Sequence, residues 1–303
     1  MQKGKDKILA NNGKPIMTRR RRQLFISALN VTAHPHPEGI YEQLLIALLD
    51  TEVFVRGSER AMVVSAQKWE NSDLFWGSLF IYTELQKDGA WFNQISKGEA
   101  TLDELKRIEI PDNLKPNLKQ MRYVFDTKRH ILYFESRNQD RQHFSPYIIG
   151  GVFSKLFKAA QHKLRSDIDI NVTVLPEKDA VDKIFNIDII KKIIIRLKTP
   201  NPDDVTSDAA KILERLDAIG AGTQDITYTK ARDADSLKPD EELKAVAEVA
   251  SKNGFVKATG RTVDGQWRSA STKEYPAAYG VFIGDAESAV DAILLFAQTR
   301  DIG

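Results

Sequence analysis

The sequence contains no cysteine among its 303 residues. This absence excludes disulfide bonds, thiol catalysis, iron–sulfur clusters and zinc sites built on cysteine. It also lacks any run of eighteen apolar residues, so we expect no membrane-spanning helix and no membrane partner. A net charge of +2 is too small to indicate a nucleic-acid-binding protein by itself. The simplest expectation is a folded cytoplasmic protein.

The sequence also lacks the common catalytic motifs. No GxGxxG follows a predicted strand, no GxxxxGK[ST] occurs, and no Gly-x-Ser-x-Gly elbow is present. We therefore predict no cofactor. Nothing in the sequence gives positive support to an enzymatic activity.

Two pairs of side chains could still bind a metal ion. His34 and His36 lie in a proline-rich loop, and Asp167 and Asp169 lie on one side at the start of a predicted strand. Paired carboxylates hold Mg²⁺ in many nucleases. Because no Glu-x-Lys motif follows at nuclease spacing, solvated side chains are the favoured interpretation and no metal site is predicted. A metal-dependent nuclease effector is kept as the alternative function.

The composition is that of a folded protein, with 42% hydrophobic and 28% charged residues. The length fits one large or two ordinary domains. Residues 1–22 form a basic tail, which is either a solvated extension or an arm that contacts phosphates. A change in composition near Ser166 predicts two α+β domains, at residues 23–166 and 167–303.

Local patterns predict helices and antiparallel strands. Leu24–Val31 is typical of a buried strand, and residues 121–125 and 130–136 alternate like a β-hairpin. Ser145 and Pro146 begin a long apolar helix that extends to Leu164. Asp264-Gly265 indicates a second hairpin. The predicted fold class is α+β, with mixed, mostly antiparallel sheets and packed helices.

The most informative feature is a set of basic residues on predicted strands. Along residues 187–198, the strand pleat places Lys192, Arg196 and Lys198 on one side. A two-residue turn at Asp264-Gly265 would place Arg261 directly opposite Arg268. Two arginines in such positions repel unless an anion lies between them.

Two further strands add to this pattern. Lys257 shares the side of Arg261, Trp267 follows in the next strand, and Tyr228 and Lys230 share one side of another strand. Cations can bind phosphates while the aromatic rings pack on sugar or base. The predicted nucleic-acid-binding residues are Lys192, Arg196, Lys198, Tyr228, Lys230, Lys257, Arg261, Trp267 and Arg268. The alternative is a solvated sheet face that happens to be basic.

Two segments resemble known families. Residues 24–41, LFISALNVTAHPHPEGIY, resemble the start of an uncharacterised bacterial domain-of-unknown-function family found beside phage-defence and mobile elements, and Ala90-Trp91-Phe92 adds to this. Residues 175–198, with the strand IDIIKKIIIRLK, are similar to a segment of the RexA family of phage-exclusion sensors. That resemblance implies a dimeric, sequence-tolerant DNA binder, but it maps no binding residue onto this chain.

These observations lead to one main hypothesis. We expect a non-enzymatic DNA-binding component of a phage-defence or exclusion system, acting as a homodimer and in some cases with a partner protein from the same operon. Besides the nuclease, a second alternative is an adaptor in which the apolar helix at residues 146–164 docks a partner.

Overall fold

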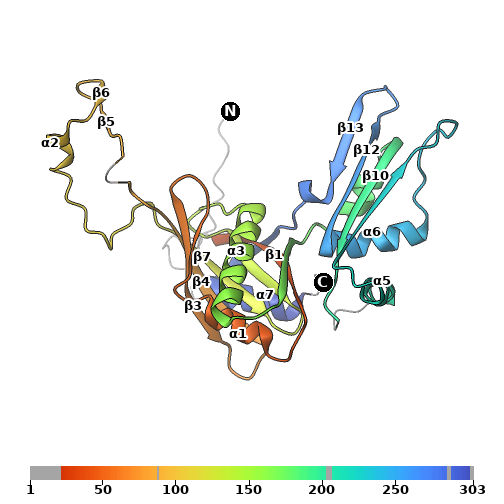
Figure 1. Ribbon diagram of the computed structural model, residues 1–303, viewed down its shortest axis with the longest axis horizontal. Helices are drawn as coiled ribbons and strands as arrows, with labels where there is room; N and C mark the ends of the chain where they lie inside the picture. Colours follow the sequence, from red (N-terminus) through yellow and green to blue (C-terminus); the bar gives the residue numbers. More distant parts are fainter. Residues whose placement is uncertain (1–21, 87–88, 203–206, 285–287, 301–303) are drawn as a thin grey trace, which may run out of the picture.

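The computed structural model describes residues 22–86, 89–202, 207–284 and 288–300. Antiparallel sheets with helices packed against them confirm the α+β prediction (Figure 1). Residues 1–21 of the predicted basic tail lie outside the described residues. The prediction was wrong for Arg22, which begins the first strand and pairs with Ile283.

An eight-stranded sheet forms the main body of the molecule. Its order is β14-β1-β8-β7-β4-β3-β2, and β9 also pairs with β1. The strands are β1 Arg22–His34, β2 Glu52–Phe54, β3 Glu59–Lys68, β4 Leu74–Thr83, β7 Lys119–Asp126, β8 Ile131–Arg137, β9 Asp169–Val174 and β14 Tyr279–Ile283. Strand β1 is buried along most of its length because both faces of the sheet are covered.

Helices cover both faces of this sheet. Helices α1 (Ile40–Ala47) and α3 (Pro146–Leu164) lie on one face, and α7 (Ala289–Thr299) lies on the other. Helix α3 has the bounds that its apolar spacing predicts. It buries one stripe of side chains, Ile149, Val152, Phe153, Leu156, Phe157 and Ala160.

A four-stranded sheet stands beside the main body, at the right in Figure 1. Its order is β11-β10-β12-β13, with β10 Ile189–Lys198, β11 Thr223–Thr229, β12 Gly254–Arg261 and β13 Trp267–Ser271. The helices that accompany it are α4 Ala180–Phe185, α5 Ser207–Ala218, α6 Glu241–Asn253 and the 3-10 helix η1 Thr272–Glu274. Helices α4 and α6 pack on one face of the sheet and bury Ile193, Ile195 and Leu197.

An arm between β4 and β7 projects away from the main sheet (Figure 1). It carries β5 (Phe92–Asn93), β6 (Gly98–Glu99) and α2 (Leu102–Leu105). Thr101 caps α2 in a reciprocal capping box with Glu104, the arrangement typical of Thr followed three residues later by Glu.

The main sheet combines strands from both sides of the predicted boundary at Ser166. Strands β9 and β14 and helix α7 follow this residue, yet they pack with β1 or on its sheet. The domain division therefore stays a prediction. None of the helices in the described residues combines the length and hydrophobicity needed to cross a lipid bilayer.

Two glycines follow helices for different reasons. Gly220 follows α5 with a φ of 66°, the left-handed conformation that favours glycine after a helix. Gly254 follows α6, but its φ of 169° is extended. A Cβ at Gly254 would lie 2.1 Å from the carbonyl oxygen of Arg196. Glycine is needed there because β10 and β12 approach closely.

Candidate nucleic-acid interface

The strand registers bring six of the nine predicted residues onto one face of the four-stranded sheet. Ile194 pairs with Lys257, and Arg261 pairs with Trp267. Residues directly opposite each other share a face, and residues two apart in one strand do as well. We call this surface the basic face. It consists of Lys192, Arg196, Lys198, Lys257, Arg261 and Trp267.

The basic face is open to solvent. Helices α4 and α6 cover the opposite face, where the alternate isoleucines of β10 are buried. Lys192, Arg196 and Arg261 are exposed, and the Trp267 side chain is 62% exposed. The alternation of β10 therefore points Ile193, Ile195 and Leu197 to the helices and Lys192 and Arg196 to solvent.

The predicted pairing of Arg261 with Arg268 was wrong. The N–H of Thr262 donates to the carbonyl of Gln266 (2.9 Å), and the N–H of Gly265 donates to that of Thr262 (2.9 Å). The loop therefore has three residues, with Gly265 at a φ of 81°, instead of two. This shifts the register by one residue, so Arg268 lies opposite Gly260 and on the other face.

Two other predicted residues also lie away from the basic face. Tyr228 pairs with Ile193, so its ring lies on the helix-covered side, where it is 44% exposed. Lys230 follows the end of β11, and its Nζ donates hydrogen bonds to the carbonyls of Ala231 and Ala234. The pattern within each strand could not show how the strands align with one another.

The positive charges of the basic face are unequal. Arg196 donates two hydrogen bonds to the carboxylate of Asp225, at 2.7 and 2.6 Å. This pairing lowers the pKa of Asp225 and raises the pKa of Arg196, and it neutralises one positive charge.

The other four cations keep their charge uncompensated. Lys198 donates to the amide oxygen of Asn171 at 2.6 Å, a partner without charge. Lys192, Lys257 and Arg261 make no ion pair with any described residue. The basic face therefore presents four uncompensated positive charges from two neighbouring strands, β10 and β12.

The basic face continues into a cleft between the two sheets. This cleft has a volume of about 380 Å³ and lies between α3 and β9 on one side and β10, β12 and η1 on the other. Phe255 and Lys273 line it beside Arg196 and Lys198. The Nζ of Lys273 lies 4.2 Å from the centre of the Phe255 ring. The cleft thus adds an aromatic ring and a further cation, Lys273, which forms no ion pair with any residue that the structure describes.

Sequence reasoning did not select Phe255 or Lys273. The strand pleat could have identified Phe255, because it stands two residues before Lys257 and therefore lies on the same face of the strand. Lys273 stands at the end of the predicted second strand of the hairpin, but the pleat could not place its side chain because η1 turns the chain there. Tyr147 also lines the cleft; burial raises its pKa to about 12, and the negative charge of Glu274 adds to this shift.

The candidate metal ligands do not form one cluster. His34 lies opposite Asp169, but its Nε2 is 3.0 Å from the carbonyl oxygen of Thr199. The ring of His36 packs against Tyr41 and His130 instead. Across the part of the chain that the structure describes, no three His, Asp or Glu side chains are grouped to hold a metal ion.

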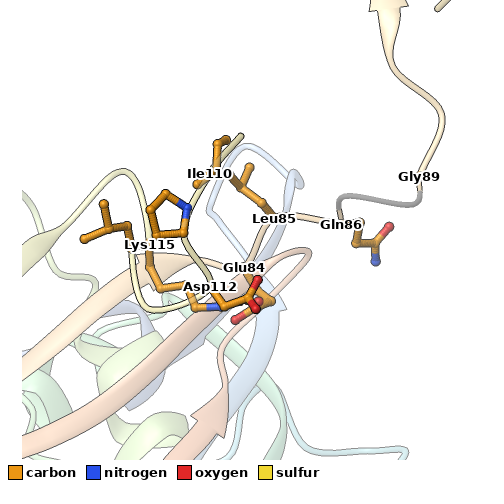
Figure 2. Close-up of a pocket in the computed structure, with 9 residues that line it drawn as sticks. Glu84, Leu85, Gln86, Gly89, Ile110, Asp112 and Lys115 are labelled. Carbon is orange, nitrogen blue, oxygen red and sulfur yellow. The ribbon is translucent and has the colours of Figure 1, made fainter. Parts of the chain in front are cut away.

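A second pocket, of about 480 Å³, lies at the base of the arm. Figure 2 shows Glu84, Asp112 and Lys115 together on one side of it, while Gln86 points away. Lys115 forms an ion pair with Glu84. With two carboxylates and one lysine, this pocket does not favour an anion.

Comparison with known proteins places the chain in a family. Curated proteins give no match. The model of DUF4747, a domain of unknown function, matches residues 22–297. This range includes the basic face, the cleft and both sheets. The expected kinship with a domain-of-unknown-function family is thereby confirmed, and the chain belongs to the DUF4747 family.

Proposed function

We propose that the protein binds nucleic acid, and DNA in particular, through the basic face. One observation carries the proposal: five cationic side chains and an exposed tryptophan, from three adjacent strands, share one open sheet surface. Four of these cations form no ion pair with a carboxylate among the residues that the structure describes. Nucleic-acid backbones present regularly spaced negative charges that such a surface attracts.

The contacts expected from this surface are mainly to the phosphate backbone. Lys192, Lys198, Lys257 and Arg261 neutralise phosphates, and the exposed ring of Trp267 packs on a sugar or base. Lysine contacts to phosphates carry no sequence information. Binding should therefore tolerate different sequences. The inter-sheet cleft, with Lys273 and Phe255, extends the path along which a strand can lie.

The resemblances given above supply the biological setting of the proposal. In this setting, the protein is a non-enzymatic component of a phage-defence or exclusion system. It works in the cytoplasm as a homodimer and contacts a partner protein from its own operon. Light scattering of the purified protein, with and without DNA, measures the oligomeric state directly.

Salt dependence is the first test of the proposal. Fluorescence anisotropy with labelled duplex DNA, single-stranded DNA and RNA gives an affinity at each salt concentration. Four neutralised phosphates predict a log–log slope of roughly −3 to −4 for duplex DNA. An affinity that does not change from low to physiological salt would remove the model.

A matched pair of variants tests the face itself. Arg261 and Arg268 lie in the same hairpin but on opposite faces of the sheet. Arg261→Glu should weaken DNA binding by about tenfold or more and lower the salt slope by about 1. Arg268→Glu makes the same charge change on the other face and should weaken binding by less than about threefold. Equal losses in both variants would contradict a role for the basic face.

A further inference from the structure

A third cavity, of about 610 Å³, lies at the start of α3 on the main sheet. Its walls come from β1, β8, the beginning of α3 and the segment that leads into β14. Arg56, Arg137 and His143 line it, and none of the described residues in its lining is an Asp or Glu. The cavity is therefore electropositive.

Ser27 lines this cavity, and its hydroxyl lacks a hydrogen-bond partner within the described part of the chain. Ser27 is fully buried (0% exposed), and its Oγ has no partner among the described residues. Folded proteins form hydrogen bonds with nearly all of their buried polar groups. A buried group without such a bond has lost its hydrogen bonds to water and gained none in return, which costs free energy. A bound molecule would supply the missing acceptor or donor.

Arg137 offers the main charge in the cavity. Its guanidinium lies over the ring of Phe25, 4.7 Å from the ring centre, and its buried Nε has no hydrogen-bond partner among the described residues. A planar guanidinium held in this way keeps its N–H groups available for a phosphate or carboxylate. Arg56 contributes less, because it is paired with Glu59 at 2.9 Å.

The beginning of α3 adds further donors. Ser145 is the N-cap, but its side chain makes no capping hydrogen bond, and Pro146 has no N–H to offer. The first N–H groups of a helix have no partner inside it, and the dipole of this 19-residue helix favours an anion at that end. Ser145, Pro146 and Ile148 all line the cavity.

We propose that this cavity binds a phosphate monoester with an apolar body. The phosphate lies among Arg137, the Ser27 hydroxyl and the start of α3, and the body packs on Phe25 and Phe144. A dianionic phosphate suits a guanidinium and a helix N-terminus together. This site is separate from the basic face and does not depend on the proposed binding of nucleic acid.

Isothermal titration calorimetry of the full chain with phenyl phosphate tests the ligand class. Phenyl phosphate combines a phosphate with an apolar ring, and we expect saturable binding with a Kd on the order of 1 mM or lower. Inorganic phosphate, which lacks the ring, and phenol, which lacks the phosphate, should both bind more weakly. Absence of saturable binding, or tighter binding of benzoate than of phenyl phosphate, would overturn the assignment.

Variants locate the site within the protein. Arg137→Gln should weaken phenyl phosphate binding by about tenfold or more, and Ser27→Ala by roughly threefold. Ser27→Ala should fold normally, since it removes an unpaired buried hydroxyl, so it decides the matter if Arg137→Gln is unstable. Arg107→Gln, at an exposed position on the arm, is the matched control. Both cavity variants should bind DNA as the native protein does, and native affinity for phenyl phosphate in both would refute the site.

Discussion

Glu135 is a carboxyl group inside the main sheet, with only 2% of its surface exposed. Burial raises its pKa to about 7, although a hydrogen bond from the backbone N–H of Arg122 (2.7 Å) and the charge of Arg122 act in the opposite direction. The charge of Asp140 raises the pKa slightly further. The folded protein therefore holds this proton up to neutral pH.

Glu135 should make the protein less stable as the pH rises. An unfolded chain releases this proton near pH 4.5, whereas the folded protein keeps it until about pH 7. As the pH rises from 4.5 to about 7, the free energy of unfolding therefore falls. Above about pH 7 it stays at this lower value, as far as Glu135 is concerned. Glu135→Gln removes this titration. Relative to native protein, the variant should gain on the order of 3 kcal/mol between pH 4 and pH 8.

Urea unfolding at the two pH values measures this gain. The exposed Glu109→Gln is the control, and its stability difference from native protein should be the same at both pH values. If Glu135→Gln behaved like Glu109→Gln, the folded protein would not hold the proton on Glu135.

At the scale of elements, the arm differs from the rest of the molecule. None of its described residues at positions 84–118 is buried, and Ile95 is 95% exposed. At its base, the N–H of Thr83 donates to the carbonyl of Pro116 (3.0 Å), so the two ends of the arm lie side by side. The arm therefore adds little to the stability of the main sheet.

Removing the arm should leave the fold intact. Because Thr83 and Pro116 are hydrogen-bonded, an Asn-Gly turn between Glu84 and Lys115 can close β4 and β7 as a two-residue hairpin. We expect the free energy of unfolding to change by less than about 1 kcal/mol. Chemical denaturation measures it. Leu44→Ala, in the buried core, is the contrasting control and should lose about 2–5 kcal/mol.

One outcome would contradict the expectation that the arm adds little stability. A loss as large as that of Leu44→Ala would mean that the removed segment, residues 85–114, stabilises the sheet in a way that burial does not show.

Elements were predictable where their signals are local. The bounds of α3, the capping box of α2 and the hairpin of β7 and β8 depend on residues close together in the sequence. Strand β14 was missed: Tyr279–Ile283 has only five residues, and it is a strand because β1 pairs with it. Local propensity is weak for so short a segment.

At the scale of the whole molecule, Asn201 links the segment between β10 and α5 to the main sheet through hydrogen bonds. Asn201 is fully buried. Its side-chain oxygen accepts from the N–H of Ala33 (3.1 Å) and the hydroxyl of Tyr41 (3.0 Å), and its amide donates to the carbonyl of Val31 (3.1 Å). In the sequence, Asn201 stands between Pro200 and Pro202 in a stretch that resembles a linker and carries no sign of this contact.

Asn201→Ala should therefore destabilise the protein strongly. It leaves the buried N–H of Ala33 without its partner and opens a small cavity, so we expect a loss of about 2–4 kcal/mol. Denaturant unfolding followed by tryptophan fluorescence measures the loss. Asn113→Ala, at an exposed position, should lose less than about 0.5 kcal/mol. Similar values for the two variants would mean that Asn201 does not hold the two sheets together.

The sequence by itself determined the fold class, most of the elements and which side chains alternate along β10. These depend on the pleat and on helical spacing, which the backbone imposes within each segment. The tertiary structure decided which strands face each other. It separated Arg268 from Arg261, and it brought Ser27 and Arg137 to one cavity although they are 110 positions apart in the sequence. Register follows from burying the cores of both sheets together, and that requirement is not contained in any one segment.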